Sequence, residues 1–192
     1  MSKIKWSVDP EKSFISFRVD PLIFGPVEGS FRIFDADIQT TGDAFSTIDL
    51  ILYIDAASIS TGDIERDQHL KSADFFDVQN HKQIKFTSKR IRMESHDENH
   101  ELCGELKIKD ISIEVKVAVQ AGEILEDASG NENSVFTING KVNRTDWGLT
   151  WNASPQTGGL MESEEVTIYC KVTITRKHAA SSSDLTVKPF TT

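Results

Sequence analysis

The side chains best suited to chemistry gather in residues 60–76, the one stretch whose pattern is typical of a helix. There, Arg66, Asp67 and His69 would supply a cation, a carboxylate and an imidazole for acid–base catalysis. Asp67 and His69 are two positions apart, however, and diverge by about 200° around a helix, so they do not form an acid–base pair. A partner such as Asp146 would have to come from elsewhere, and no G-x-S-x-G nucleophile motif is present. Catalysis that uses Arg66 and His69 is therefore the minor alternative.

The expected helix carries polar side chains on the face that normally meets a protein core. Thr61 is placed to cap its first turn. The stripe with i, i+3, i+4 and i+7 spacing consists of Arg66, His69, Leu70 and Ala73. Because a buried guanidinium without a partner is strongly unfavourable, this stripe lies at a wet rim or its charge is paired.

The cysteines and histidines do not form a metal-binding motif. Cys103 and Cys170 are the two cysteines, and both lie in alternating apolar runs where a thiol behaves as a small hydrophobic group. Neither a CxxC nor an HExxH spacing is present. We expect no metal site, and no disulfide either, because other features of the sequence indicate a reducing compartment.

Length and charge limit the class of partner. The 192 residues fit one domain, with a net charge of -9 and a pI near 5.0. Such an acidic protein is not expected to bind nucleic acid or to dock electrostatically on anionic membranes. No apolar run approaches the roughly 18 residues of a membrane span, so we expect no transmembrane segment. The first residues lack the apolar core of a secretory signal, which predicts a cytoplasmic protein.

Alternating apolar side chains run through most of the remaining sequence. A change of parity between Phe31 and Phe34 predicts a bulge or a sharp coil there. Counting the runs gives about eight antiparallel strands with one helical crossover, so the predicted fold class is all-β. A one-sided sheet of this size must close or form a sandwich to hide its edges. We predict an extended eight-stranded antiparallel β-barrel over residues 1–177, followed by a flexible tail over residues 178–192, which begins with a linker-like Ala- and Ser-rich stretch.

The interior of an eight-stranded barrel is either filled by side chains or able to hold one small ligand. Strands of about ten residues tilted near 40° give a barrel roughly 25 Å long, which is deep enough for a chain-like molecule. Periodicity does not distinguish a lined cavity from a filled core, so both alternatives stay open at this point.

Eight short motifs along the chain form a recognisable set. The opening strand contains W-S-V-D-P at residues 6–10 and S-F-I-S-F at residues 13–17, and V-x-G-x-F follows at residues 27–31. S-I-S-T-G at residues 58–62 leads into R-D-Q-H-L-K-S-A-D-F-F-D at residues 66–77, and I-K-F-T-S stands at residues 84–88. G-E-L-K-I-K occupies residues 104–109, and N-R-T-D-W-G-L occupies residues 143–149. Over about residues 4–176 the chain resembles the YceI family of lipocalin-like, polyisoprenoid-binding barrel proteins.

The resemblance implies an apolar barrel pore that holds an isoprenoid chain, such as an isoprenoid quinone, as a bound ligand and not as a required cofactor. The partner is then a hydrophobic small molecule, which the protein sequesters or transports. Whether the chain forms a homodimer is left open.

Two positions depart from the family pattern. Asp110 stands where the hairpin usually has Gly, and Pro21 stands where a loop His is common, so a head-group role for that His does not carry over. A stress-related structural barrel with a filled pore is the remaining alternative.

The expected pore lining is the set of inward-facing apolar side chains. These are Ile15, Phe17, Val19, Phe31, Leu50, Leu52, Phe86, Val115, Val117, Phe136, Ile138, Ile168 and Val172.

A carbonyl or phosphate head group needs hydrogen-bond donors at the mouth. The candidates for this role are Arg66, His69, Asn143 and Arg144. Structural roles compete with it, because Arg66 and Asp67 can hold the helix across the barrel end and Asn143 can set a turn before Trp147. Trp147 and Trp151 are expected to pack at the barrel end.

Overall fold

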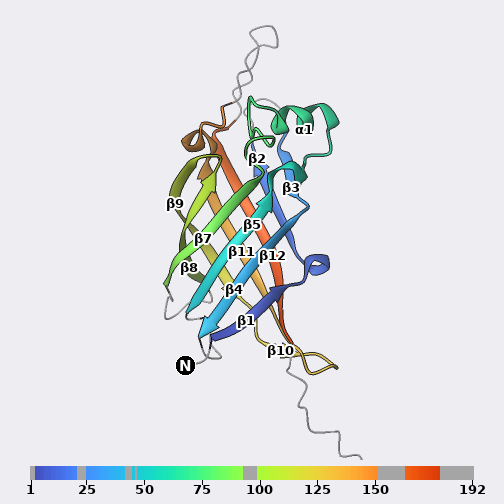
Figure 1. Cartoon of the computed structure of the whole chain (residues 1–192), viewed down its shortest axis with the longest axis vertical. Helices are drawn as coiled ribbons and strands as arrows, with labels where there is room; N and C mark the ends of the chain where they lie inside the picture. The colour runs from blue at the N-terminus through green and yellow to red at the C-terminus, as the bar shows by residue number, and fades with distance from the viewer. Residues whose placement is uncertain are drawn as a thin grey trace, which may run out of the picture.

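Strands make up most of the described part of the chain in the computed structural model, which describes residues 3–20, 25–41, 45, 47–92, 99–150 and 163–177 (Figure 1). The elements are β1 (Lys3–Val8), η1 (Pro10–Lys12), β2 (Phe14–Val19), β3 (Val27–Phe31), β4 (Phe34–Thr41), β5 (Ile48–Asp55), η2 (Ala56–Ser58), β6 (Ile59–Ser60), α1 (Ile64–Lys71), β7 (Gln83–Arg92), β8 (Asn99–Ile108), β9 (Ile111–Ala121), β10 (Leu125–Glu126), β11 (Glu132–Asn143), η3 (Arg144–Trp147) and β12 (Glu165–Arg176). The predicted tail, Pro21 and Trp151 lie outside the described residues.

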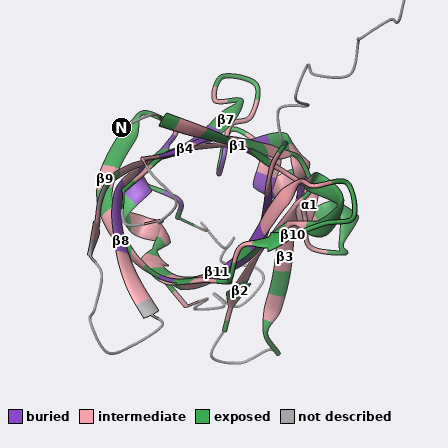
Figure 2. Cartoon of the chain, turned by 90° about the horizontal axis from the view of Figure 1, so that it is seen from below, coloured by how far each residue is buried: buried purple, intermediate pink, exposed green. Residues whose placement is uncertain are grey.

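Eight of these strands form a closed antiparallel barrel. Their order around the ring is β11, β9, β8, β7, β5, β4, β1 and β12, and β12 pairs again with β11. The closing ladder runs from Glu132 opposite Arg176 to Asn143 opposite Glu165. Figure 2 shows this ring along the barrel axis. The predicted eight-stranded barrel with one α-helical crossover is confirmed for the described residues.

Two strands share the edge of β12 that faces away from β11. β1 pairs near the C-terminal end of β12, at Ile174, and β2 pairs with residues 166–171. Between β1 and β2, the Asp9 carboxylate accepts a hydrogen bond from the backbone N–H of Glu11, and Pro10 begins η1. Since Pro10 has no N–H to give to a ladder, the chain leaves the sheet here. β3 then pairs with β2, and β6 pairs with β3.

The predicted change of parity corresponds to the break between β3 and β4. β3 ends at Phe31, and β4 begins at Phe34. The backbone N–H groups of Arg32 and Ile33 donate to the carbonyl and the hydroxyl of Ser58, at 3.3 and 3.1 Å. Inward-facing positions change from odd to even numbers across this break, as the sequence indicated.

α1 lies across one end of the barrel (Figure 1). Its N-cap is Asp63, whose carboxylate accepts the backbone N–H of Arg66 at 2.9 Å. The prediction that Thr61 caps this helix was therefore wrong, because Gly62 at φ +81° turns the chain between Thr61 and the first helical turn. Leu70 is buried beneath the helix.

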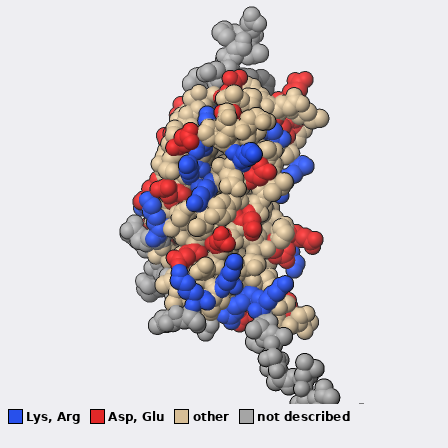
Figure 3. Space-filling view, in the orientation of Figure 1, with Lys and Arg blue, Asp and Glu red and all other residues tan. Residues whose placement is uncertain are grey.

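The outside of the barrel is charged, and its interior is apolar. Acidic and basic side chains are interspersed over the face shown in Figure 3. Some of them pair across strands, as Lys89 does with Glu105 at 3.6 Å and with Glu114 at 3.4 Å. Within the described part of the chain, the helices are too short or too polar to cross a lipid bilayer.

Candidate ligand-binding cavity

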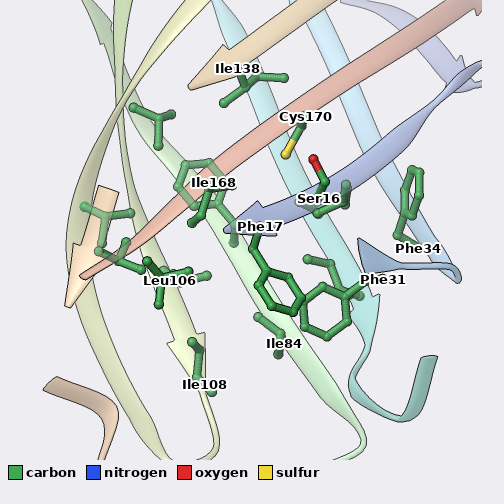
Figure 4. A pocket seen from close by; sticks show the side chains of 18 of the residues that line it. Ser16, Phe17, Phe31, Phe34, Ile84, Leu106, Ile108, Ile138, Ile168 and Cys170 are labelled. Atoms are coloured by element: carbon green, nitrogen blue, oxygen red, sulfur yellow. The ribbon is translucent and has the colours of Figure 1, made fainter. Parts of the chain in front are cut away.

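The barrel encloses an apolar cavity of about 280 Å³. All thirteen side chains predicted to line a pore border this cavity. Figure 4 shows several of them, including Phe17, Ile138 and Ile168, pointing into the same space. Of the two alternatives that the alternation left open, the structure therefore contains a lined cavity. Its volume lies near the lower end of the roughly 300–1,000 Å³ found for small-molecule sites.

Two phenylalanine rings lie against glycines of neighbouring strands, which keeps them close to the barrel wall. A Cβ built on Gly29 of β3 would meet Cζ of Phe17 at 2.3 Å, and one built on Gly104 of β8 would meet Cζ of Phe86 at 2.2 Å. Both rings border the cavity. Because a glycine leaves room for a ring on the sheet surface, these pairs preserve open space in the lumen.

A row of aromatic rings lines the cavity beneath α1. The ring centroids of Phe17 and Phe31 are 5.7 Å apart, and Phe31 meets Phe76 edge-on at 6.1 Å. Phe76 meets Phe75 edge-on at 5.0 Å. Sequence reasoning did not assign Phe75 and Phe76 to the lining, because they follow the helix without a strand period. Ile84, Leu106 and Ile108 were also left out, although their alternation with neighbouring liners was a usable signal.

Arg66 borders the cavity and belongs to a hydrogen-bonded group with Thr61 and Asp67. Its Nε donates to Thr61 Oγ1 at 2.8 Å, and its Nη2 donates to the Thr61 carbonyl at 3.1 Å. The Asp67 carboxylate accepts from Thr61 Oγ1 at 2.6 Å and from Thr61 N at 2.8 Å. Arg66 and Asp67 thus tie α1 to the segment after β6, which is the structural role that competed with head-group binding.

Arg144, the first residue of η3, also borders the cavity. Its Nε donates to the Ser163 carbonyl at 3.3 Å, and its Nη1 donates to the Leu149 carbonyl. Trp147 is almost completely buried in the same turn, and its Nε1 donates to the Leu106 carbonyl at 3.2 Å. Trp147 also borders the cavity, at the barrel end where it was expected to pack. η3 lies at the same barrel end as α1 (Figure 1).

The other two head-group candidates do not border the cavity. Asn143 is exposed, and its side-chain oxygen accepts from the backbone N–H of Thr145 at 3.0 Å, so it caps η3. Its Nδ2 donates to Glu164 at 3.3 Å. His69 is half-buried on α1 and lies outside the cavity lining. The structure therefore brings Arg66 and Arg144 to the cavity and leaves Asn143 and His69 outside it.

Cys170 is the one thiol that borders the cavity. Burial among apolar side chains raises the pKa of this thiol to about 12. Cys103 and Cys170 are both free and buried. The described residues contain no group of three His, Cys, Asp or Glu side chains that could hold a metal ion.

The chain is similar in sequence to known proteins. A family model described as YceI-like domain matches residues 6–174. A UPF0312 protein of Staphylococcus aureus strain N315 is 29% identical over 162 residues, which covers 84% of this chain and 91% of the relative.

Solved structures show the same fold. The YCEI protein of Campylobacter jejuni superposes with a TM-score of 0.70 at 25% identity, covering 83% of this chain and 90% of that chain. BcnA of Burkholderia cenocepacia gives a TM-score of 0.71 at 22% identity, covering 86% and 98%. A polyisoprenoid-binding domain from Saccharophagus degradans gives a TM-score of 0.63 at 15% identity, covering 90% and 98%.

Proposed function

The chain belongs to the YceI-like family, and from this premise we propose that it holds a polyisoprenoid or a similar long-chain lipid, such as an isoprenoid quinone, inside the barrel. The observation that carries the proposal is the cavity itself. Its lining is almost entirely apolar, and Arg66 and Arg144 are the two charged residues among the described ones that border it. The Saccharophagus degradans domain of similar fold is described as polyisoprenoid-binding, which supports the same ligand class here.

Apolar burial would supply most of the affinity. Removing a CH₂ group from water contributes about 0.8 kcal/mol, so a five-carbon isoprene unit would contribute up to about 4 kcal/mol before the entropic cost of ordering the chain. The aromatic row of Phe17, Phe31 and Phe76 offers flat surfaces that suit the planar double bonds of such a chain. A polar ligand would find few partners along this wall.

The two arginines are the groups that we propose for the polar head. Of the five N–H donors of a guanidinium, Arg66 and Arg144 each use two in hydrogen bonds among the described residues, which leaves three on each. Carbonyl and phosphate oxygens both accept such donors. A quinone or a phosphorylated prenyl group would therefore place its head at the α1 end of the barrel.

Binding without turnover is the mode of action that we propose. The carboxylate of Asp67 is engaged by Thr61, and the imidazole of His69 does not border the cavity. The acid–base groups required by the enzyme alternative are thus away from the proposed ligand. Sequestration or transport of the lipid is the role that we propose for this cavity.

Solvent extraction of the purified protein, followed by mass spectrometry of the extract, tests this function. We expect about one long-chain lipid per chain. Ile168→Trp fills the lumen and should remove most of the bound lipid. Lys171→Trp places the same side chain on the outer face of β12, so this variant should retain the lipid. An extract without lipid, together with native mass spectra that show only the bare chain after incubation with farnesol, would refute the proposal.

A further inference from the structure

Three aromatic rings lie in contact at the barrel end away from α1. Phe136 of β11 borders the cavity, and its ring meets that of Phe45 edge-on at 4.7 Å. Phe45 in turn packs on Trp6 of β1 at 5.5 Å. Trp6 is only 2% exposed, and its Nε1 donates to Thr40 Oγ1 at 3.0 Å. Neither Trp6 nor Phe45 borders the cavity, so the open space ends at this aromatic layer.

A charged layer lies directly beyond the rings. The guanidinium of Arg176 lies 5.6 Å from the centroid of the Trp6 ring, and it forms an ion pair with Glu132, the residue opposite it in the closing ladder. Both side chains of this pair are 29% exposed. A hydrocarbon that passed the rings would have to separate this pair, which is unfavourable in a partly buried setting.

The two ends of the cavity therefore differ in chemistry. Thr61, Arg66 and Arg144 border the cavity at the end covered by α1 and η3. Apolar rings backed by an ion pair lie at the other end. A lipid with one polar head is complementary to this arrangement in one direction only, with its tail toward Phe136.

We propose that Trp6, Phe45 and Phe136 form a floor that sets both the direction and the maximum length of the bound chain. This inference rests on the proposed function. Each added carbon that enters the lumen raises the affinity of the ligand, because it moves from water into apolar surroundings. Once the tail touches the floor, a longer ligand must leave carbons in water at the α1 end, and its affinity stops rising. The protein would thus select a chain length as well as a ligand class.

Phe45 is the residue through which this length can be changed. It lies between β4 and β5 and not within a strand, so its truncation leaves the barrel ladders intact. Phe45→Ala removes the middle ring of the floor and opens space between Phe136 and Trp6. Phe45→Leu is a milder variant that keeps an apolar side chain in case the alanine variant folds poorly. Phe14→Ala is the matched control, because Phe14 is 42% exposed on the outer face of β2.

The experiment is an internal competition read by native mass spectrometry. Delipidated full-length chain is incubated with an equimolar mixture of geraniol, farnesol, geranylgeraniol and solanesol, and the bound masses are compared. Because the readout is a ratio of ligands on folded protein, it does not depend on the folded fraction.

We expect the wild-type chain to favour one length. Phe45→Ala should raise the ratio of the next longer alcohol to that one by about tenfold or more, since each newly buried CH₂ is equivalent to about fourfold. Phe45→Leu should shift the ratio in the same direction by less, and Phe14→Ala should leave it unchanged.

The failures of the two proposals are distinguishable. If the wild-type chain binds none of the alcohols, the proposed function fails and the floor fails with it. If the wild-type chain binds them but both Phe45 variants keep the wild-type ratios, or if affinity rises through solanesol without a limit, the floor alone is overturned.

Discussion

The ring of Phe17 lies so close to the α-carbon of Gly29 that a methyl group at Gly29 would approach Phe17 Cζ to 2.3 Å. The two residues are paired in the β2–β3 ladder. The ring of Phe86 in β7 also lies close to Gly104 in β8, whose ladder partner is Ser88, and a Cβ added to Gly104 would approach Phe86 Cζ to 2.2 Å. The width of the lumen thus depends on two positions that have no side chain of their own.

Gly29→Ala should push the Phe17 ring into the lumen. We expect lipid capacity to fall and the free energy of unfolding to drop by about 1–3 kcal/mol, as is usual for overpacking. Lipid content after extraction and urea denaturation measure the two effects. Gly25→Ala is the control, since a Cβ there would meet nothing within 4 Å. Unchanged lipid content in Gly29→Ala would show that the ring position does not limit the cavity.

Replacing the two arginines should weaken binding of a charged head more than binding of a neutral one. For Arg66→Gln and Arg144→Gln, we expect the dissociation constant for farnesyl monophosphate to rise about tenfold or more, since a charge-assisted hydrogen bond contributes about 1.5–3 kcal/mol. The constant for farnesol should change less. Titration calorimetry with both ligands measures the difference.

Asp67→Asn is the control for the structural role of Arg66. It weakens the hold of α1 on Thr61 but leaves the guanidinium in place. If Asp67→Asn weakens farnesyl monophosphate binding as much as Arg66→Gln does, the effect of Arg66 comes from the position of α1 and not from contact with the head group.

Asp63→Ala should destabilise the protein by about 1 kcal/mol, because it leaves the N–H of Arg66 without its cap. Thermal denaturation followed by circular dichroism measures this loss. Gln68→Ala, an exposed position within the same helix, should have little effect. A larger loss at Gln68 than at Asp63 would contradict the assignment of the cap.

The Cys170 thiol should stay protonated and unreactive at neutral and mildly alkaline pH, because burial raises its pKa to about 12. A pKa raised in the folded state means that the unfolded chain loses this proton first. The contribution of Cys170 to stability is therefore complete below about pH 9 and is lost as the pH rises toward 12. Cys170→Ala should remove a pH-dependent part of the unfolding free energy of up to about 4 kcal/mol. Denaturant unfolding at a series of pH values compares the two chains, and parallel curves would disprove the prediction.

Sequence reasoning predicted the barrel well because each strand has one apolar face. Alternation of apolar side chains identified the strands and even the break between Phe31 and Phe34. It did not predict whether the lumen is open. The Phe17–Gly29 pair depends on the register between two strands, which a single sequence does not contain.

The polar end of the cavity was harder to predict, because local geometry redirects side chains. Arg66, His69 and Leu70 share one helical stripe, but only Arg66 and Leu70 border the cavity. Leu70 is about 40° from Arg66 around the helix, whereas His69 is about 60° away in the opposite direction, so only one edge of the stripe faces inward. Asn143 turns back to cap η3, as Asn residues do before a helical turn.

The position of β12 in the ring affects how the protein folds during synthesis. It closes the ring by pairing with β11 on one side and with β1 and β2 on the other, so that Val8 contacts Ile174 across nearly the whole chain. While the nascent chain is still on the ribosome, β1, β2 and β11 therefore expose unpaired edges that other chains can join. Contacts so distant in sequence also form slowly. We expect chaperone demand and aggregation during translation to be greatest just before the last strand emerges.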